Sequence, residues 1–67
     1  MDIVKKFGLK IRKVRLDNKM SQGKLAKKLS ISPAYISQIE RGFGNLSLRK
    51  IDQLAKALGL SVDKLLK

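Results

Sequence analysis

Apolar residues recur at intervals of three and four along this chain, which is the spacing of helices rather than of strands. The first stripe consists of Val4, Phe7, Ile11 and Val14. It predicts a helix running roughly from Ile3 to Asn18. Three further stripes start near Leu25, Ile36 and Leu48, and a short one starts at Val62. The chain is therefore predicted to be all-α, with five short helices.

Serine residues mark where the last four of these helices begin. A serine hydroxyl can accept a hydrogen bond from a free N–H group of the first helical turn. The four serines are Ser21, Ser32, Ser47 and Ser61. Pro33 strengthens the third start, because proline already has the φ angle of the first helical position. Gly59 follows the fourth stripe, where a left-handed residue commonly ends a helix.

Very little chain separates the second predicted helix from the third. Leu29 ends one helix and Ser32 begins the next, so roughly Ser30–Ser32 forms the connection. Two short helices joined by such a turn form a helix-turn-helix, here over about residues 21–41. No repeat, low-complexity stretch or linker appears, and we expect residues 1–67 to form one domain.

The composition limits the classes of partner and activity to expect for this chain. The 67 residues include 16 Lys+Arg and 5 Asp+Glu, a net charge of +11, which favours a nucleic acid or an anionic membrane as partner. The chain has no cysteine and no histidine, so we expect no metal, no cofactor and no enzymatic activity. A serine nucleophile would need a lysine base, and no Ser/Lys pair stands out. No apolar run approaches the roughly 18 residues of a membrane span.

Several short motifs have the spacing of a known family. They are Ser21-Gln22, Leu25-Ala26, Tyr35-Ile36-Ser37 and Ile39-Glu40-Arg41-Gly42, with Phe7-Gly8 upstream and Leu54–Gly59 downstream. Together they resemble the helix-turn-helix of phage Cro and lambda-type repressors, also called the xenobiotic-response-element family, over nearly the whole chain. The segment from Glu40 to Leu48 is similar to restriction–modification controller proteins of that family.

The resemblance carries expectations for fold and partners. It implies a compact five-helix, lambda-repressor-like DNA-binding domain and a cytoplasmic protein of a bacterium or phage. It also implies a homodimer that binds a pseudo-palindromic, double-stranded DNA operator, with the third helix in the major groove. We expect no small-molecule ligand and no membrane. Repression and activation are not distinguished.

Three residues depart from the family pattern. Ser30 stands where glycine or asparagine is usual, so a positive φ there would carry strain. Gly23 lies in the first turn of the second helix and should weaken it slightly. Leu46 replaces a frequent proline.

The third predicted helix has one face without large apolar residues. Ile36 and Ile39 mark the face that should be buried, and Tyr35 lies on the flank. The opposite face is almost uncharged and carries Pro33, Ala34, Ser37, Gln38 and Arg41. Glutamine can pair with adenine, serine with either base class, and an alanine methyl can meet a thymine methyl. An ordinary solvated helix face is the alternative, and Tyr35 could stack on a base, bind a phosphate or cover the core edge.

The start of the second helix is a second candidate contact. Free N–H groups and the positive end of the helix dipole favour a phosphate there. The resemblance implies that Gln22 contacts backbone phosphate and braces the third helix; an ordinary first-turn residue is the alternative. Arg41 and Asn45 are further phosphate candidates. The full set of expected DNA contacts is Gln22, Ser32, Pro33, Ala34, Tyr35, Ser37, Gln38, Arg41 and Asn45.

Other residues are expected to have structural or general roles. The resemblance implies a buried salt bridge between Arg15 and Glu40. Residues 1–28 hold ten Lys+Arg and two Asp, and we expect this excess to act as a general field around DNA. Leu9 and Leu16 form a second apolar strip that we expect to be partly buried.

The end of the chain is more apolar than a short final helix requires. Its apolar residues are Leu60, Val62, Leu65 and Leu66. Some should close the core, and the resemblance implies that the rest form the two-fold surface of the homodimer. Two recognition helices about 34 Å apart would then meet successive major grooves.

Two other classes of function stay open. The first predicted helix opposes lysines to an apolar stripe, as a membrane-active protein would. An antitoxin-like or other protein-interaction module that also binds DNA is the second. Single-stranded nucleic acid is less favoured, because the three aromatic residues form no stacking platform.

Overall fold

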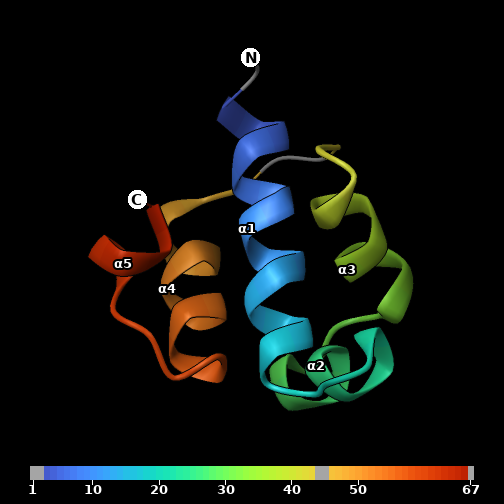
Figure 1. Cartoon of the computed structure of the whole chain (residues 1–67). Helices are drawn as coiled ribbons and strands as arrows, with labels where there is room; N and C mark the ends of the chain where they lie inside the picture. Colours follow the sequence, from blue (N-terminus) through green and yellow to red (C-terminus); the bar gives the residue numbers. More distant parts are fainter. Residues whose placement is uncertain (1–2, 44–45, 67) are drawn as a thin grey trace.

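The computed structural model describes residues 3–43 and 46–66, and of Leu66 the backbone alone. Within these residues it contains five helices and no strand, so the predicted all-α class and helix order are confirmed. The helices are α1 (Ile3–Asp17), α2 (Gln22–Leu29), α3 (Pro33–Glu40), α4 (Leu48–Ala57) and α5 (Val62–Leu66). Figure 1 shows α1 in the middle, with α3 on one side and α4 and α5 on the other.

The predicted helix starts are confirmed by hydrogen bonds. Each of the four serine hydroxyls accepts a bond from the backbone N–H three residues later. The bonds join Ser21 to Lys24 (3.0 Å), Ser32 to Tyr35 (3.2 Å), Ser47 to Lys50 (3.1 Å) and Ser61 to Lys64 (3.2 Å). Gly59 has a φ of +73°, the left-handed conformation expected after α4.

Two helices end on left-handed residues that are not glycine. Ser30, at the position where the family usually has glycine or asparagine, has a φ of 57°, and Lys19 has a φ of 56° that the sequence did not indicate. After each of them the next N–H turns back to a helix carbonyl: Ile31 to Ala26 at 3.0 Å and Met20 to Arg15 at 3.1 Å. A side chain in this conformation costs roughly 1–2 kcal/mol, which these terminal hydrogen bonds partly offset.

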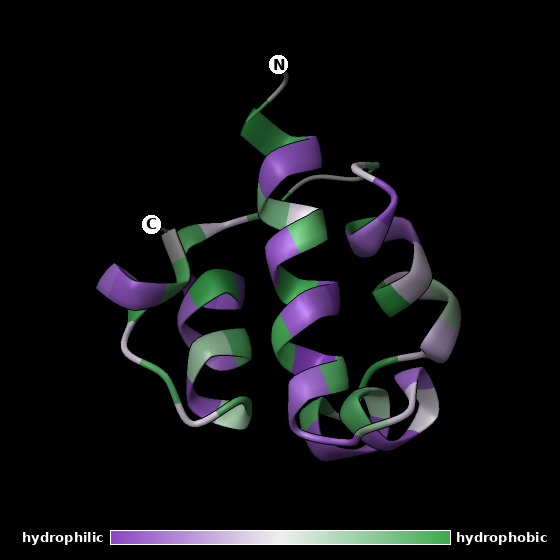
Figure 2. Ribbon diagram, in the orientation of Figure 1, coloured by the Kyte–Doolittle hydropathy of each residue, from purple (hydrophilic) through white to green (hydrophobic). Residues whose placement is uncertain are grey.

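The core gathers apolar residues from all five helices. Its fully buried large side chains are Ile11, Leu25, Ile36, Ile39, Leu54 and Leu65. Figure 2 shows hydrophilic and hydrophobic residues alternating along α1 and α4. At helical spacing the hydrophobic residues fall on one side of each helix, and this side packs into the core.

The close approach of α1 to α3 depends on Gly8. A β-carbon at this position would collide with the carbonyl oxygen of Ile39 and would lie 2.9 Å from that of Glu40. Both obstacles are backbone atoms, which cannot rotate away as a flexible side chain can. Glycine therefore lets the end of α3 pack directly against α1 and fixes where α3 sits.

Two expectations for apolar side chains need correction. Leu9 and Leu16 are 55% and 53% exposed, so the partial burial expected of them is wrong. Both lie off the stripe of Phe7 and Ile11 that faces the core. Leu65, one of the four apolar residues expected to be shared between the core and a dimer surface, is 1% exposed; it closes the core and is not available to a dimer surface, because α5 packs on α1 and α4. No helix among the described residues is both long and apolar enough to cross a bilayer.

Candidate nucleic-acid interface

The outward side of α3 presents short polar groups. Pro33, Ala34 and Gln38 are exposed, Ser37 is half-buried, and Arg41 is exposed just after the helix ends. Ile36 and Ile39 point the other way and are completely buried. The structure thus brings the five predicted residues of this face together on one surface.

The start of α3 is fixed by its own cap. The Ser32 hydroxyl accepts the Tyr35 N–H at 3.2 Å, and Pro33 occupies the first helical position. Ser32 remains exposed at the same end of the helix as Pro33 and Ala34. Asn45, the remaining predicted contact of the following loop, lies outside the described residues.

A buried ion pair joins α1 to the end of α3. Arg15 Nε donates to Glu40 Oε2 at 2.6 Å, and Arg15 Nη2 donates to Glu40 Oε1 at 3.0 Å. Arg15 Nη1 donates to the Met20 carbonyl at 2.7 Å, so each terminal nitrogen has a partner. Both residues are 6% exposed. The predicted salt bridge is confirmed, and its two parallel hydrogen bonds orient α3 against α1.

Gln22 extends this network to the first turn of α2. Its Nε2 donates to Glu40 Oε1 at 3.2 Å, and the side chain is half-buried. The primary amide has a second N–H and a carbonyl oxygen for other partners. The bracing of α3 expected of Gln22 is therefore supported by a hydrogen bond to the last residue of that helix. Its phosphate contact stays a prediction.

Tyr35 is held by α4. Its ring is half-buried against the core, and Lys50 Nζ lies 5.7 Å from the ring centre. A cation at this distance from an aromatic ring is attracted to it. Of the three roles left open for Tyr35, the structure supports covering the core edge. Sequence reasoning missed the contribution of Lys50, because only the folded chain brings α4 to this position.

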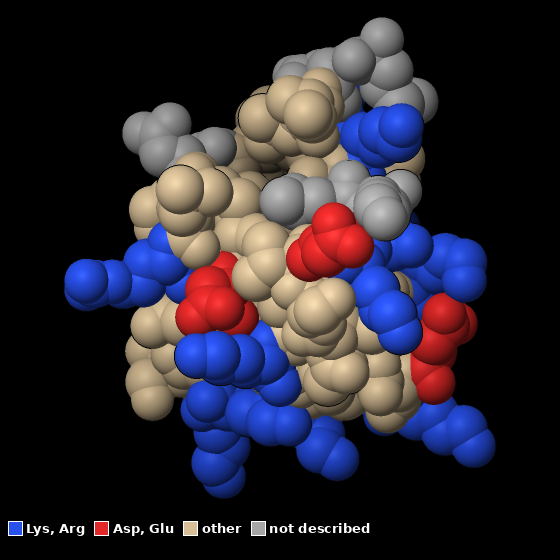
Figure 3. Space-filling model, turned by 90° about the vertical axis from the view of Figure 1, so that its left-hand side faces the viewer, with Lys and Arg blue, Asp and Glu red and all other residues tan. Residues whose placement is uncertain are grey.

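Positive charge gathers outside α3, which itself contains no lysine or arginine. Figure 3 shows the face that α4 and α5 present, with Lys and Arg gathered over its lower part. Lys27, Lys28 and Lys56 line a hollow between α2 and the end of α4. Lys28 Nζ also donates to the Ala57 carbonyl at 3.0 Å, near the negative end of the α4 dipole. Basic side chains from α2 and α4 thus meet at this hollow.

A family model described as helix-turn-helix matches residues 11–65 of the chain. The chain is 48% identical over 61 residues to control protein C.BamHI of Bacillus amyloliquefaciens. That similarity covers 90% of this chain and 75% of the relative.

Two solved structures show the same fold over almost the whole chain. One is the restriction-modification controller protein C.AhdI of Aeromonas hydrophila, with 38% identity and a TM-score of 0.86, covering 96% of each chain. The other is the clp gene regulator ClgR of Corynebacterium glutamicum, with 30% identity and a TM-score of 0.95. The second similarity covers 98% of this chain and 85% of ClgR.

Proposed function

The chain belongs to the helix-turn-helix family of DNA-binding regulators, and from this premise we propose that it recognises a specific double-stranded DNA operator. In the proposed complex α3 lies in the major groove. The observation that best supports this proposal is the exposed polar face of α3, which the buried ion pair of Arg15 and Glu40 holds rigidly. A reading surface must be fixed to discriminate bases, because a loosely held side chain fits several base pairs equally well.

Base recognition is assigned to the exposed face of α3. Gln38 is the best candidate for a bidentate contact with adenine, and Ser37 and Ala34 flank it on the same face. Ser32 and Pro33 lie at the N-terminus of α3, where a contact with phosphate or sugar is more fitting than a contact with a base. Tyr35 covers the edge of the core beside them, and a DNA contact of its side chain stays a prediction. The solvated-face alternative predicts no change in sequence preference when Gln38 is replaced.

Backbone contacts are assigned to both ends of the helix-turn-helix. Gln22 stands at the positive end of α2 and keeps hydrogen-bonding capacity beyond Glu40. Arg41 and Asn45 follow α3 in the chain. These contacts position the protein without reading sequence. In this proposal residues 1–67 form a single DNA-binding domain of a cytoplasmic protein. The domain needs no cofactor and has no catalytic activity.

A homodimer would double the recognition surface. Leu60, just before α5, and Val62, the first residue of α5, are half-buried and keep apolar surface for a second copy. Leu65 is used within the protomer, and the side chain of Leu66 lies outside the described residues. A symmetric pair would place two α3 helices about 34 Å apart, one helical turn of DNA, on a pseudo-palindrome.

The relatives suggest the regulated genes. C.BamHI is named a control protein and C.AhdI a restriction-modification controller protein. We propose that this chain likewise controls genes of a restriction–modification system. The similarity to C.BamHI extends along most of both chains, which supports a shared role better than a match confined to the helix-turn-helix would.

Selection from random duplex DNA tests this function. The protein is equilibrated with the pool at several salt concentrations, and the bound sequences are determined. We expect an enriched motif with two-fold symmetry and half-sites about 10 base pairs apart. Retention of all sequences alike, with affinity falling steeply as salt rises, would contradict the proposal, since it would leave only the charge field. Half-sites without symmetry would contradict the homodimer alone.

A further inference from the structure

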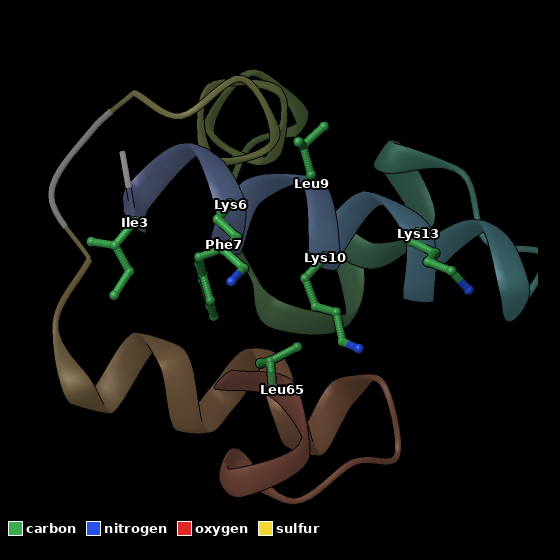
Figure 4. Close-up of a pocket in the computed structure, with 7 residues that line it drawn as sticks. All are labelled: Ile3, Lys6, Phe7, Leu9, Lys10, Lys13 and Leu65. Atoms are coloured by element: carbon green, nitrogen blue, oxygen red, sulfur yellow. The ribbon is translucent and has the colours of Figure 1, made fainter. Parts of the chain in front are cut away.

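Phe43 is a large aromatic residue that stays in water just beyond the end of α3. It is 59% exposed and belongs neither to the core nor to the apolar residues packed against it. Leu9 on α1 is exposed to a similar degree, 55%, and Figure 4 shows it pointing away from Leu65. Single exposed apolar residues are common in proteins, so exposure alone gives neither residue a role. Phe43 differs from Leu9 in having a fixed position beside Gln38.

Two backbone hydrogen bonds fix the turn that carries Phe43. The Phe43 N–H donates to the Gln38 carbonyl at 2.8 Å, and the Gly42 N–H donates to the Ile39 carbonyl at 3.1 Å. Gly42 is left-handed, with a φ of +83°, so the turn is a Schellman motif at the end of α3. A β-carbon on Gly42 would lie 3.0 Å from Lys5 Cα, because the turn also packs closely on α1. The backbone of Phe43 is therefore held in place relative to α3.

The same motif brings Phe43 beside the residue proposed to contact adenine. In a Schellman motif the residue after the left-handed glycine commonly packs against the residue whose carbonyl it binds, which here is Gln38. Gln38 and Arg41 are both exposed. Glu40, the acidic residue of this stretch, is buried in its pair with Arg15 and presents no free charge there. An approaching DNA duplex would thus meet Phe43 and Gln38 together.

The length of α3 keeps this turn close to the base pairs. Its eight residues rise by about 12 Å, at roughly 1.5 Å per residue. The major groove of DNA is also about 12 Å wide. A helix of this length does not carry its last turn out of the groove, so Phe43 stays within reach of base edges when α3 lies there.

We propose that Phe43 reads a thymine through its C5 methyl group, next to the base pair that Gln38 reads. A phenyl ring has no hydrogen bond to offer to a phosphate or to a base. The thymine methyl is the apolar group that base pairs present in the major groove, and phenylalanine is among the residues that contact it. The contact removes apolar surface of both groups from water. This inference rests on the proposed function, because it requires α3 to lie in the major groove.

Replacing thymine by uracil tests this contact, because uracil lacks only the methyl group. The operator selected from random duplex DNA supplies the parent sequence, and each thymine of a half-site is replaced in turn. Affinities are measured with wild type, Phe43→Ala, Phe43→Leu and Leu9→Ala. The last variant removes an equally exposed apolar side chain from α1 and is the matched control. Thermal unfolding checks that each variant keeps the fold.

Wild type should lose about fourfold in affinity at one thymine per half-site, which corresponds to uncovering one methyl group. Phe43→Ala should bind the thymine and uracil operators equally at that position. It should also bind the parent operator at least about fourfold more weakly than wild type does. Phe43→Leu should keep part of the thymine preference, because leucine is still apolar, and Leu9→Ala should keep all of it.

Three results would overturn this inference alone. A loss on uracil substitution that persists in Phe43→Ala would assign the methyl contact to another residue, such as Ala34. No loss at any thymine would show that no methyl group is read. A change in the oligomeric state of Phe43→Ala in sedimentation would place the ring between two copies of the chain. Failure of the selection to enrich any operator would refute the proposed function as well, so the two failures are distinguishable.

Discussion

Replacing Gly8 by alanine should destabilise the protein, although alanine favours helices. In a helix interior this substitution alone stabilises by about 1 kcal/mol. Here the added methyl group would collide with the Ile39 carbonyl oxygen and lie 2.9 Å from that of Glu40. Since those atoms are backbone, α1 and α3 must separate as units, which exposes core contacts along both helices.

The two effects oppose each other, and packing should win. Overpacking typically costs about 1–3 kcal/mol, and rigid backbone obstacles place this site at the upper end. After the helix preference is subtracted, Gly8→Ala should lose about 2 kcal/mol. For a domain of this size, that lowers the melting temperature by roughly 8–16 °C.

Gly23→Ala is the matched control. Its added β-carbon would meet only the Ser21 Oγ, at 3.9 Å, so there is no clash. Gly23 lies in α2, and we expect its replacement to stabilise by about 0.4–1 kcal/mol. The melting temperatures of both variants, measured by circular dichroism, test these two expectations. The reasoning is refuted if Gly8→Ala melts at or above the wild-type temperature, as Gly23→Ala should.

Three further substitutions test the scaffold of the interface. Glu40→Gln should lower the free energy of unfolding by about 3–5 kcal/mol, because Arg15 is left as a buried charge without a counter-charge. In urea titrations, the double variant Arg15→Met/Glu40→Leu should recover most of that loss. Reduced DNA binding of Glu40→Gln without a change in stability would contradict the scaffold role. Ser30→Gly should raise the melting temperature, since it relieves about 1 kcal/mol of left-handed strain; an unchanged melt would show that no strain is stored there. Ser32→Ala should cost about 1 kcal/mol through loss of the cap on α3, and equal stability in denaturant would show that the cap contributes nothing.

Helix order and helix starts were predictable because they depend on local chemistry. A serine before an apolar stripe satisfies the first N–H groups wherever the rest of the chain lies, and the four caps have the predicted geometry. The left-handed Lys19 escaped prediction because no glycine or asparagine marks that position. Hydrogen bonds at the end of α1 accompany it: the Met20 N–H donates to the Arg15 carbonyl, and Arg15 Nη1 donates to the Met20 carbonyl.

The candidate site likewise has features that the sequence predicts and features that it does not. The polar face of α3 follows from helical periodicity, and the pair of Arg15 and Glu40 from the family resemblance. Contacts between distant helices were not predictable. The contact of Lys50 with the Tyr35 ring depends on how α4 approaches α3. The lack of room for a side chain at Gly8 depends on how α1 approaches α3. The exposure of Leu9 likewise depends on α3 and α5 covering only part of α1.

The most direct test of base reading by α3 is a substitution scan of the selected operator with two glutamine variants. Affinities for every single base-pair change are measured with wild type, Gln38→Ala and Gln53→Ala, which replaces an exposed glutamine on α4. The proposed function predicts that Gln38→Ala abolishes a preference of about 5- to 150-fold at one base pair per half-site, and that Gln53→Ala changes nothing. Equal weakening at every position by Gln38→Ala, or no effect at all, would contradict base reading by this helix.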